Sequence, residues 1–321
     1  MNKSIQELSD QLTTEVSKII FGKEDRIRLI IMALLSQGHV LLEDLPGVGK
    51  TTLVRTLSIA SGCDSRRIQF VPDLLPSDIT GMNIYDRNTG EFRHMPGPVF
   101  TNLLLADEIN RAVPRTQSAL LEAMEERQVT LDGETRALKK PFVVMATQNP
   151  VESESTFPLP VAQMDRFLIR LSMGYPSPEE ERNMLFALGG SMPYGQVRAV
   201  TSPEELVEAQ HTAYETLMSP LVADYLIALV TATRNHTELR MGASPRASRA
   251  LFRASKTWAA MKGRAFVTPD DIRELAVPVL AHRLLLTNQA RLTGATQTSI
   301  LEQILQTIPV PPTNGEEFHR S

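Results

Sequence analysis

The segment from Val40 to Thr52, VLLEDLPGVGKTT, contains residues whose types and spacing can bind phosphate. An apolar strand runs into a short Pro/Gly loop, which ends in Gly-Lys-Thr where a helix is expected to begin. Gly47 and Gly49 let the backbone turn so that successive N–H groups point at one anion, and the helix adds its positive dipole end. Lys50 would neutralise the outer phosphates, and the Thr51 hydroxyl would hold Mg²⁺. The segment therefore predicts a phosphate-binding loop.

The loop departs from the usual G-x-x-x-x-G-K-[ST] pattern at its first position, which is Asp44 in this chain. A strand-to-helix turn with a purely structural role is the alternative. We favour phosphate binding, because Gly-Lys-Thr after an apolar strand is hard to reach by chance. The residues expected to line the phosphates are Pro46, Gly47, Val48, Gly49, Lys50, Thr51 and Thr52.

Two acidic residues, Asp107 and Glu108, end an apolar strand about fifty residues after the loop. In a phosphate-loop fold such a strand lies beside the loop, so Asp107 would hold Mg²⁺ through water and Glu108 would polarise the attacking water. A solvated strand end is the alternative for the two acids alone. Their position after a phosphate loop favours the catalytic interpretation.

Three further polar residues could complete a catalytic site. Asn149 follows the apolar run of PFVVMATQNP, where its amide could orient the water or touch the γ-phosphate, although an Asx-turn is the alternative. Arg166, in QMDRFLIR, lies at the start of the last expected strand and could instead form a structural ion pair. Arg246 lies in the first turn of a helix, where a cation opposes the dipole by about 0.3–1 kcal/mol unless an anion is nearby. An exposed, solvent-screened side chain is the alternative there.

The elements that must position these residues alternate between strands and amphipathic helices. Apolar runs of the kind buried on both faces of a parallel sheet predict strands at 40–43, 68–71, 103–107, 142–147 and 167–173. Two hairpins interrupt the alternation, at 82–95 with a turn at Asn88-Thr89-Gly90 and at 129–138 with a turn at Asp132-Gly133. This pattern predicts an α/β sandwich.

After Tyr175 the expected strands stop and capped helices follow. Ser-Pro-Glu-Glu at 177–180 and 202–205 and Thr-Pro-Asp-Asp at 268–271 each place a hydroxyl at the N-cap, proline at the first helical position and an acid at N3. We therefore expect a core over 1–175, an all-helical domain over 176–308 and a disordered Pro-rich tail over 309–321.

Composition limits the remaining classes of function. The 321 residues, 42% of them hydrophobic, are enough for two domains, and a net charge of −4 provides no general attraction to nucleic acid or to an acidic membrane. The single cysteine, Cys63, permits neither an internal disulfide nor a Cys-based zinc site, and the six histidines show no ligand spacing. The N-terminus carries charges where a signal peptide would be apolar, so we expect a cytoplasmic protein without membrane insertion.

Several of these segments together resemble the AAA+ ATPases, and among them the MoxR family. The resemblance covers about residues 15 to 305, with DLPGVGKT as Walker A, LLLADEINRA as Walker B, ATQNP as sensor 1, LPVAQMDRF as the arginine-finger segment and GASPRAS as sensor 2. It implies a parallel sheet sandwiched by helices, two inserted β-hairpins and a helical lid. The core and lid of this AAA+ P-loop module would correspond to the two domains expected above.

The resemblance also implies roles by position. Lys50 and Thr51 would bind phosphate and Mg²⁺, Asp107 and Glu108 would be the Walker B pair, Asn149 would be sensor 1, Arg166 the finger acting on a neighbour's nucleotide, and Arg246 sensor 2 in cis or in trans. The adenine pocket is expected at Ile20, Phe21 and Gly22. Arg111 and Arg115 match more loosely, as a nucleotide contact or as structural ion pairs.

The implied activity is Mg²⁺-dependent ATP hydrolysis between the subunits of a ring, expected to be a hexamer. The implied task is chaperone-like remodelling, such as maturation of a metalloenzyme, with a partner that carries a von Willebrand factor A domain. A nucleic-acid loader or motor is one alternative, disfavoured because the 129–138 hairpin balances its basic residues with Asp132 and Glu134. A nonhydrolysing ATP-binding scaffold is the other, and it would be expected to lack Glu108 or Arg166.

Overall fold

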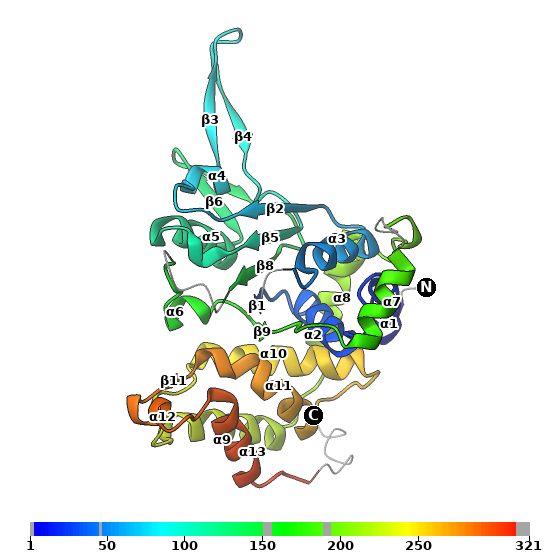
Figure 1. Cartoon of the computed structure of the whole chain (residues 1–321), viewed down its shortest axis with the longest axis vertical. Helices are drawn as coiled ribbons and strands as arrows, with labels where there is room; N and C mark the ends of the chain where they lie inside the picture. The colour runs from blue at the N-terminus through cyan, green and yellow to red at the C-terminus, as the bar shows by residue number, and fades with distance from the viewer. Residues whose placement is uncertain (1–2, 45–46, 150–155, 189–193, 313–321) are drawn as a thin grey trace. The chain divides into compact units, whose positions relative to one another are not determined.

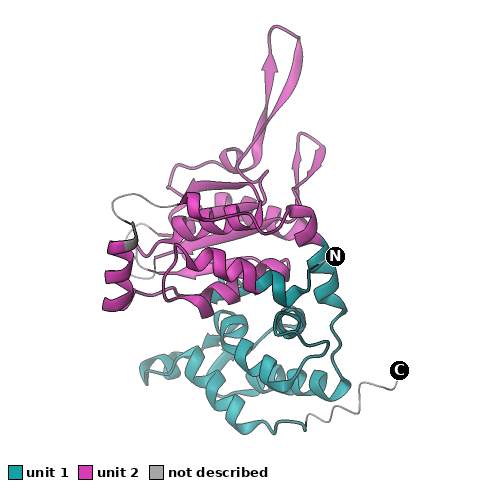
Figure 2. Ribbon diagram, turned by 90° about the vertical axis from the view of Figure 1, so that its right-hand side faces the viewer, with its two compact units in different colours: residues 1–9, 160–170, 208–321 teal, residues 10–159, 171–207 magenta. Residues whose placement is uncertain are grey.

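The computed structural model describes residues 3–44, 47–149, 156–188 and 194–312, and the chain forms two compact units. Unit 1 comprises residues 1–9, 160–170 and 208–321, and unit 2 comprises 10–159 and 171–207 (Figure 2). The expected domain boundary at residue 175 stays a prediction. Most of the expected tail, residues 313–321, lies outside the described residues.

Unit 2 is built on a five-stranded sheet with the order β2-β5-β8-β1-β9 (Figure 1). Its strands are β1 (Val40–Glu43), β2 (Ser65–Gln69), β5 (Leu103–Asp107), β8 (Val143–Gln148) and β9 (Ile169–Leu171), through which the boundary between the units passes. The pairs β2–β5, β5–β8 and β1–β8 are parallel, and the apolar residues of β1, β5 and β8 are buried, as expected for central strands. The predicted parallel sheet is confirmed.

Edge strand β2 begins earlier than the apolar run predicted. Its first three residues, Ser65 to Arg67, are polar and exposed, and only Ile68 is buried. An edge strand needs little apolar side chain, so hydrophobicity alone did not reveal its start.

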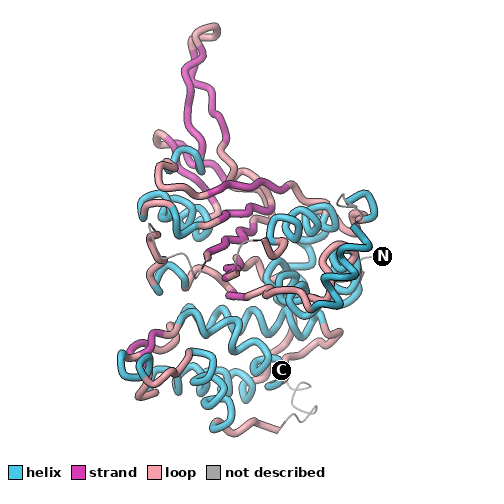
Figure 3. The backbone as a smooth tube through the Cα atoms, viewed as in Figure 1, coloured by secondary structure: helices cyan, strands magenta, loops and turns pink. Residues whose placement is uncertain are grey.

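Helices accompany the sheet strands along the chain, as the alternating pattern predicted (Figure 3). They are α1 (Ile5–Ser17), α2 (Glu24–Leu35), α3 (Lys50–Ser61), α4 (Pro76–Thr80), α5 (Pro114–Glu126), α7 (Pro178–Leu188) and α8 (Pro203–Glu215), of which α1 and α8 cross the unit boundary. The apolar face of α2 is buried through Ile27, Ile30, Ile31, Leu34 and Leu35. Among the described residues, no helix is long and apolar enough to cross a membrane.

Two antiparallel hairpins extend from unit 2 (Figure 1). The longer one pairs β3 (Gly81–Asp86) with β4 (Glu91–Pro96) and exposes Tyr85 and Phe92, which pack edge to face across the strands. The shorter one pairs β6 (Gln128–Leu131) with β7 (Glu134–Ala137). Its turn residues, Asp132 and Gly133, both have positive φ angles, as a two-residue hairpin loop requires. Both predicted hairpins are confirmed.

Unit 1 contains α6 (Val161–Met164), α9 (Pro220–Asn235), α10 (Pro245–Met261), α11 (Pro269–Leu280), α12 (Asn288–Leu292) and α13 (Gln297–Thr307). The predicted helical lid is confirmed, but the expectation that no strand follows residue 175 is wrong. A short antiparallel pair joins β10 (Leu239–Met241) to β11 (Leu285–Leu286). The strands have only three and two residues, which is too short for the alternation of apolar and polar residues that would reveal a strand in the sequence.

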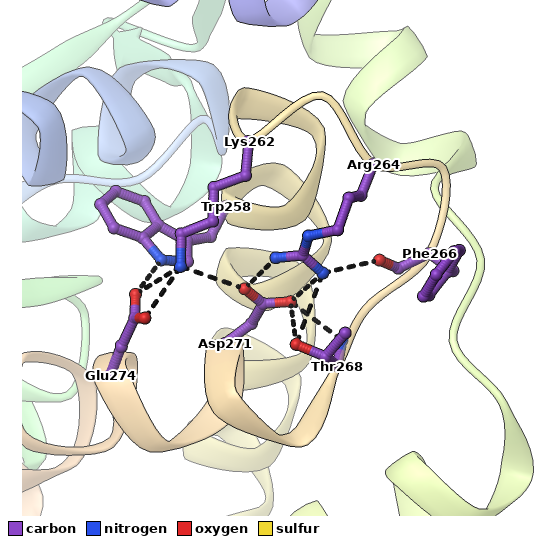
Figure 4. Close-up of polar contacts among 7 residues, drawn as sticks. All are labelled: Trp258, Lys262, Arg264, Phe266, Thr268, Asp271 and Glu274. Atoms are coloured by element: carbon purple, nitrogen blue, oxygen red, sulfur yellow. Dashed lines mark hydrogen bonds and ion pairs between the residues drawn. The ribbon is translucent and has the colours of Figure 1, made fainter. Parts of the chain in front are cut away.

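A buried carboxylate anchors the start of α11 (Figure 4). Asp271 is fully buried; it accepts hydrogen bonds from the main-chain N–H of Thr268 at 2.9 Å and from both terminal nitrogens of Arg264 at 2.5 and 2.8 Å. Burial acts to raise the pKa of Asp271, but the hydrogen bonds from Arg264 and Thr268 outweigh it and hold that pKa below its ordinary value. The predicted capping box at Thr268 is therefore also an ion-pair site.

Candidate nucleotide-binding site

The parallel strands place the predicted phosphate and water-activating residues at one edge of the sheet. Strand β8 lies between β1 and β5, with Thr147 level with Leu42 and Ala146 level with Ala106. The residues that follow these strands therefore meet at the carboxyl edge, where open α/β sheets bind ligands. They are the loop before α3, the pair Asp107 and Glu108, and Asn149.

The loop before α3 leaves room for an anion against its backbone. Gly47 and Gly49 have φ angles of +87° and +82°, and no atom lies within 4 Å of a Cβ built on either residue. Gly49 is the N-cap of α3 and provides no side-chain cap, so the first turn of the helix can donate to a ligand. These features fit a bound phosphate. Pro46 lies outside the described residues.

Asp44, the departure from the usual pattern, has a structural role that the sequence did not reveal. The residue is 4% exposed, and its carboxylate accepts three hydrogen bonds, from the Ser172 hydroxyl at 2.7 Å and from the N–H groups of Met173 at 2.8 Å and Gly174 at 3.0 Å. Its carbonyl accepts a fourth, from Lys50 Nζ at 3.1 Å. Asp44 therefore joins the start of the loop to the segment after β9.

Asp107 is held by two side chains from the neighbouring strands. Oδ1 accepts a hydrogen bond from the Thr147 hydroxyl at 2.6 Å, and Oδ2 accepts one from Arg67 Nη2 at 2.7 Å. Oδ2 thus already pairs with a cationic group. Asp107 and the exposed Thr51 hydroxyl provide oxygen ligands of the kind that Mg²⁺ prefers, so this donor set fits the ion.

Glu108 has an unusual backbone conformation and a fixed side chain. Its φ angle is +55°, which is uncommon for a residue other than glycine, and its N–H donates to Thr147 Oγ1 at 2.8 Å. Its Oε2 accepts a hydrogen bond from Gln69 Nε2 at 2.8 Å and pairs with Arg111 at 3.2 Å. The Thr147 hydroxyl therefore connects both acids, because it donates a hydrogen bond to the Asp107 carboxylate and accepts one from the N–H of Glu108.

The remaining expected contacts of unit 2 are placed as follows. Asn149 is 8% exposed and directly follows β8, beside the acids of β5. Arg111 forms an ion pair with Glu108, as one of its two interpretations expected. A nucleotide contact of Arg111 stays a prediction. Arg115 is exposed in the first turn of α5.

The expected adenine segment, Ile20 to Gly22, connects α1 to α2 and packs near the start of α7. Gly22 has a φ angle of +66°, and a Cβ atom there would lie 1.7 Å from Glu180 Oε1. Lys23 donates to the carbonyl of Tyr175 at 2.9 Å. Only glycine suits position 22, because of both its backbone angle and this close approach. The structure leaves the adenine contact itself as a prediction.

Arg166 and Arg246 belong to unit 1, whereas the residues described above belong to unit 2. Arg166 is half-buried between α6 and β9, and Arg246 is exposed in the first turn of α10. The residue before Arg166, Asp165, accepts hydrogen bonds from Ser244, the N-cap of α10, and from Arg283. Unit 1 therefore contains both arginines and connects their segments.

Sequence reasoning missed the residues that hold the acids in place. Arg67, Gln69 and Thr147 carry no motif of their own and act through strand order and register. Arg283 is 118 residues from Asp165. For Gln69 and Thr147, the sequence offered one indication of a role at the site, which is a polar residue near the end of an expected strand.

Comparisons with known proteins agree with this geometry. The model of the AAA ATPases (ATPase family associated with various cellular activities) matches residues 39–169, and the model of the AAA lid domain matches 231–304. Chaperone MoxR1 of Mycobacterium tuberculosis is 43% identical over 94% of this chain and 82% of its own length. The uncharacterised YeaC of Bacillus subtilis is 46% identical over 96% of this chain and 97% of its own length. Protein MoxR of Paracoccus denitrificans is 31% identical over 91% of this chain and 93% of its own length. The crystal structure of a protein assigned as an ATPase, from Cytophaga hutchinsonii, superposes with a TM-score of 0.90 at 38% identity over 96% of each chain.

Proposed function

Because this chain belongs to the MoxR family of AAA+ ATPases, we propose that it hydrolyses ATP with Mg²⁺ and uses the energy to remodel a partner protein. One observation carries the hydrolytic half of the proposal. Thr147 holds Asp107 and Glu108 together at the sheet edge where the phosphate loop begins α3. A scaffold that only binds ATP would not need two acids fixed in this way.

In this proposal, one set of residues in unit 2 binds the phosphates and the ion, and another set activates the attacking water. The loop N–H groups and Lys50 would bind the phosphates, and Thr51 and Asp107 would hold Mg²⁺, which would supply positive charge to neutralise the phosphates. Glu108 accepts a proton from the attacking water or orients it, and Asn149 positions the same water or the γ-phosphate. Gln69 binds only Oε2 of Glu108, and a carboxylate has two acceptor oxygens, so Glu108 can keep this hydrogen bond while Oε1 accepts one from the water.

We propose roles in the assembly for two arginines of unit 1. We assign Arg166 to the γ-phosphate bound by a neighbouring subunit and Arg246 to the sensor 2 position, with a ring, taken as a hexamer, as the active form. A finger supplied in trans is worth roughly 10³-fold or more in rate, because its charge stabilises the transition state. Family membership and the sequence position of Arg166 support this assignment.

The task of the ATPase is proposed from its relatives. A relative named as a chaperone supports a remodelling role, and we extend it to maturation of a complex, including metal insertion, with a partner that carries a von Willebrand factor A domain. The exposed hairpins of unit 2 are the elements that we expect to convey nucleotide state to this partner. We place the protein in the cytoplasm.

Mixing two inactive variants tests the shared site. An Arg166→Ala subunit keeps its own pocket but donates no finger, whereas a Lys50→Ala subunit has a defective pocket but still donates one. We expect negligible phosphate release from either variant alone and recovered release from the mixture. Co-purification of the two variants on different affinity tags verifies that mixed assemblies form. Mixed assemblies without recovered hydrolysis would contradict the trans role of Arg166.

A further inference from the structure

A buried arginine, Arg283, encloses the backbone on both sides of Arg166. Its side chain is 3% exposed, and its Nε donates to Asp165 Oδ1 at 2.6 Å. Nη2 donates to the carbonyls of Asp165 at 3.2 Å and Phe167 at 2.7 Å, and Nη1 donates to the carbonyl of Leu168 at 3.1 Å. A further hydrogen bond from Nη1 reaches the carbonyl of Val279 on α11. One guanidinium group thus fixes residues 165, 167 and 168, which surround Arg166.

The other oxygen of Asp165 connects the same segment to α10. Ser244 donates its hydroxyl to Asp165 Oδ2 at 2.9 Å and accepts the N–H of Ala247 at 3.2 Å as the N-cap of α10. Arg246 lies in the turn that this cap begins. Asp165 is therefore bound to Arg283 on one side and to the helix of Arg246 on the other.

Stability alone does not explain why an arginine is buried at this position. A buried ion pair contributes little net stability compared with apolar residues of similar volume, because both charges lose their hydration. The five donors of a guanidinium lie in one rigid plane, so five acceptors around it are held in a defined geometry. Lysine, with one flexible ammonium group, could not fix the same set of carbonyls.

We propose that Arg283 is a positioning residue for Arg166, holding this finger segment in a fixed relation to Arg246 within unit 1. The inference rests on the proposed function of Arg166 as the finger for a neighbouring site. It assigns a role to a residue that would not contact the nucleotide itself. Because a displacement of about 1 Å in a catalytic group can cost 10²-fold in rate, a loosened finger segment would reduce catalysis without affecting nucleotide binding.

The test places Arg283→Lys on one subunit of the mixed assembly at a time. In the finger donor, Lys50→Ala with Arg283→Lys should recover on the order of 10²-fold less hydrolysis than Lys50→Ala alone. In the acceptor, Arg166→Ala with Arg283→Lys should be rescued within about twofold of Arg166→Ala, because that subunit has no finger to position. In the otherwise unmodified protein, Arg283→Lys should lower kcat and leave the KM for ATP unchanged.

Arg264 provides a matched control in the same unit. Arg264 also binds a buried carboxylate, Asp271, but it contacts neither Arg166 nor Asp165 through any hydrogen bond described (Figure 4). A donor with Lys50→Ala and Arg264→Lys should therefore rescue as well as Lys50→Ala alone, even if its melting temperature falls as much as that of the Arg283→Lys donor. Asp165→Asn, which removes the charge and keeps the shape, is a milder second donor variant if Arg283→Lys does not fold. We expect this donor to recover about tenfold less hydrolysis than Lys50→Ala alone, because Arg283 would still bind the carbonyls around Arg166 and the finger segment would be loosened only in part.

The outcomes separate this inference from the proposed function. If the parental pair, Arg166→Ala with Lys50→Ala, shows no rescue, the trans role of Arg166 fails and this inference fails with it. If the parental pair rescues but Arg283→Lys or Asp165→Asn acts equally in donor and acceptor, the residue has a general folding role, and only the positioning inference is overturned. Full rescue by the modified donor would overturn it as well.

Discussion

Arg67 on β2 donates two hydrogen bonds to Oδ2 of Asp107 on β5, from Nε at 3.2 Å and from Nη2 at 2.7 Å. The two residues are 40 positions apart in the sequence and are brought together because β2 pairs in parallel with β5. The carboxylate proposed to hold Mg²⁺ therefore has an arginine as its counter-ion in this structure. Arg67 and the ion would compete for the same negative charge.

Arg67→Gln should strengthen the response to Mg²⁺. The Arg67 side chain is half exposed, so the pair is screened by solvent and worth at most about 1 kcal/mol, which corresponds to roughly a fivefold change in affinity. We expect the Mg²⁺ concentration for half-maximal ATP hydrolysis to fall by about twofold to fivefold. Arg66→Gln removes the same charge from the preceding residue, whose side chain points to the opposite face of the strand, and is the control. An unchanged or increased Mg²⁺ requirement in Arg67→Gln would contradict the competition.

Asp44→Asn should destabilise unit 2 and weaken nucleotide binding. Asparagine offers one acceptor oxygen for three donors, so at least one buried donor loses its partner, at a cost of about 1–3 kcal/mol. The attachment of the start of the phosphate loop to residues 172–174 would weaken, so the KM for ATP should rise. Urea unfolding and nucleotide titration measure the two effects. Asp64→Asn, which changes an exposed carboxylate of the same unit, should leave the urea unfolding midpoint nearly unchanged.

The pH dependence of unit 1 should include a contribution from His282. This side chain is fully buried, its Nε2 donates to the carbonyl of Phe167 at 3.1 Å, and burial, with the neighbouring charge of Arg283, holds its pKa well below the ordinary value. Below about pH 6.5 the unfolded chain binds a proton at this position that the folded chain does not, so stability falls as the pH falls. The slope from one such group is at most about 1.4 kcal/mol per pH unit.

Trp258, the only tryptophan of the chain, lies on α10 and reports unfolding of unit 1. Urea unfolding followed by its fluorescence between pH 5 and pH 7.5 should show that His282→Gln has a flatter pH dependence than the unmodified protein. His211→Gln, which changes an exposed histidine of the same unit, should retain the original slope. Equal slopes for His282→Gln and the unmodified protein would mean that His282 does not contribute.

The sequence predicted those parts of the fold that are encoded locally. Central strands such as β5 are continuous apolar runs, and the turn at Asp132-Gly133 has the residues that a two-residue loop needs. The phosphate loop and the acids after β5 were found for the same reason, because each is a short motif attached to such a strand. Local patterns were sufficient for the elements and for the chemistry at their ends.

Contacts between distant segments could not be predicted in this way. Thr147 meets Asp107 only because of the order β5-β8 and the register of that pair, neither of which is written in either strand. Arg283 reaches Asp165 across 118 residues, and its own sequence context marks it only as a charged residue after a helix. The strand pair β10–β11 was too short for any pattern. Side chains that position the site, rather than the motif residues themselves, are what the structure added.

Lys50 and Glu108 have separate roles in the proposed mechanism, Lys50 in nucleotide binding and Glu108 in hydrolysis. Phosphate release and nucleotide affinity measured on purified Glu108→Gln and Lys50→Ala test this separation. We predict that Glu108→Gln binds ATP as the unmodified protein does but loses hydrolysis by about 10²-fold or more, since it cannot act as a base, and that Lys50→Ala binds ATP weakly. Near-normal phosphate release by Glu108→Gln would contradict the assignment of this residue and, with it, the proposed mechanism.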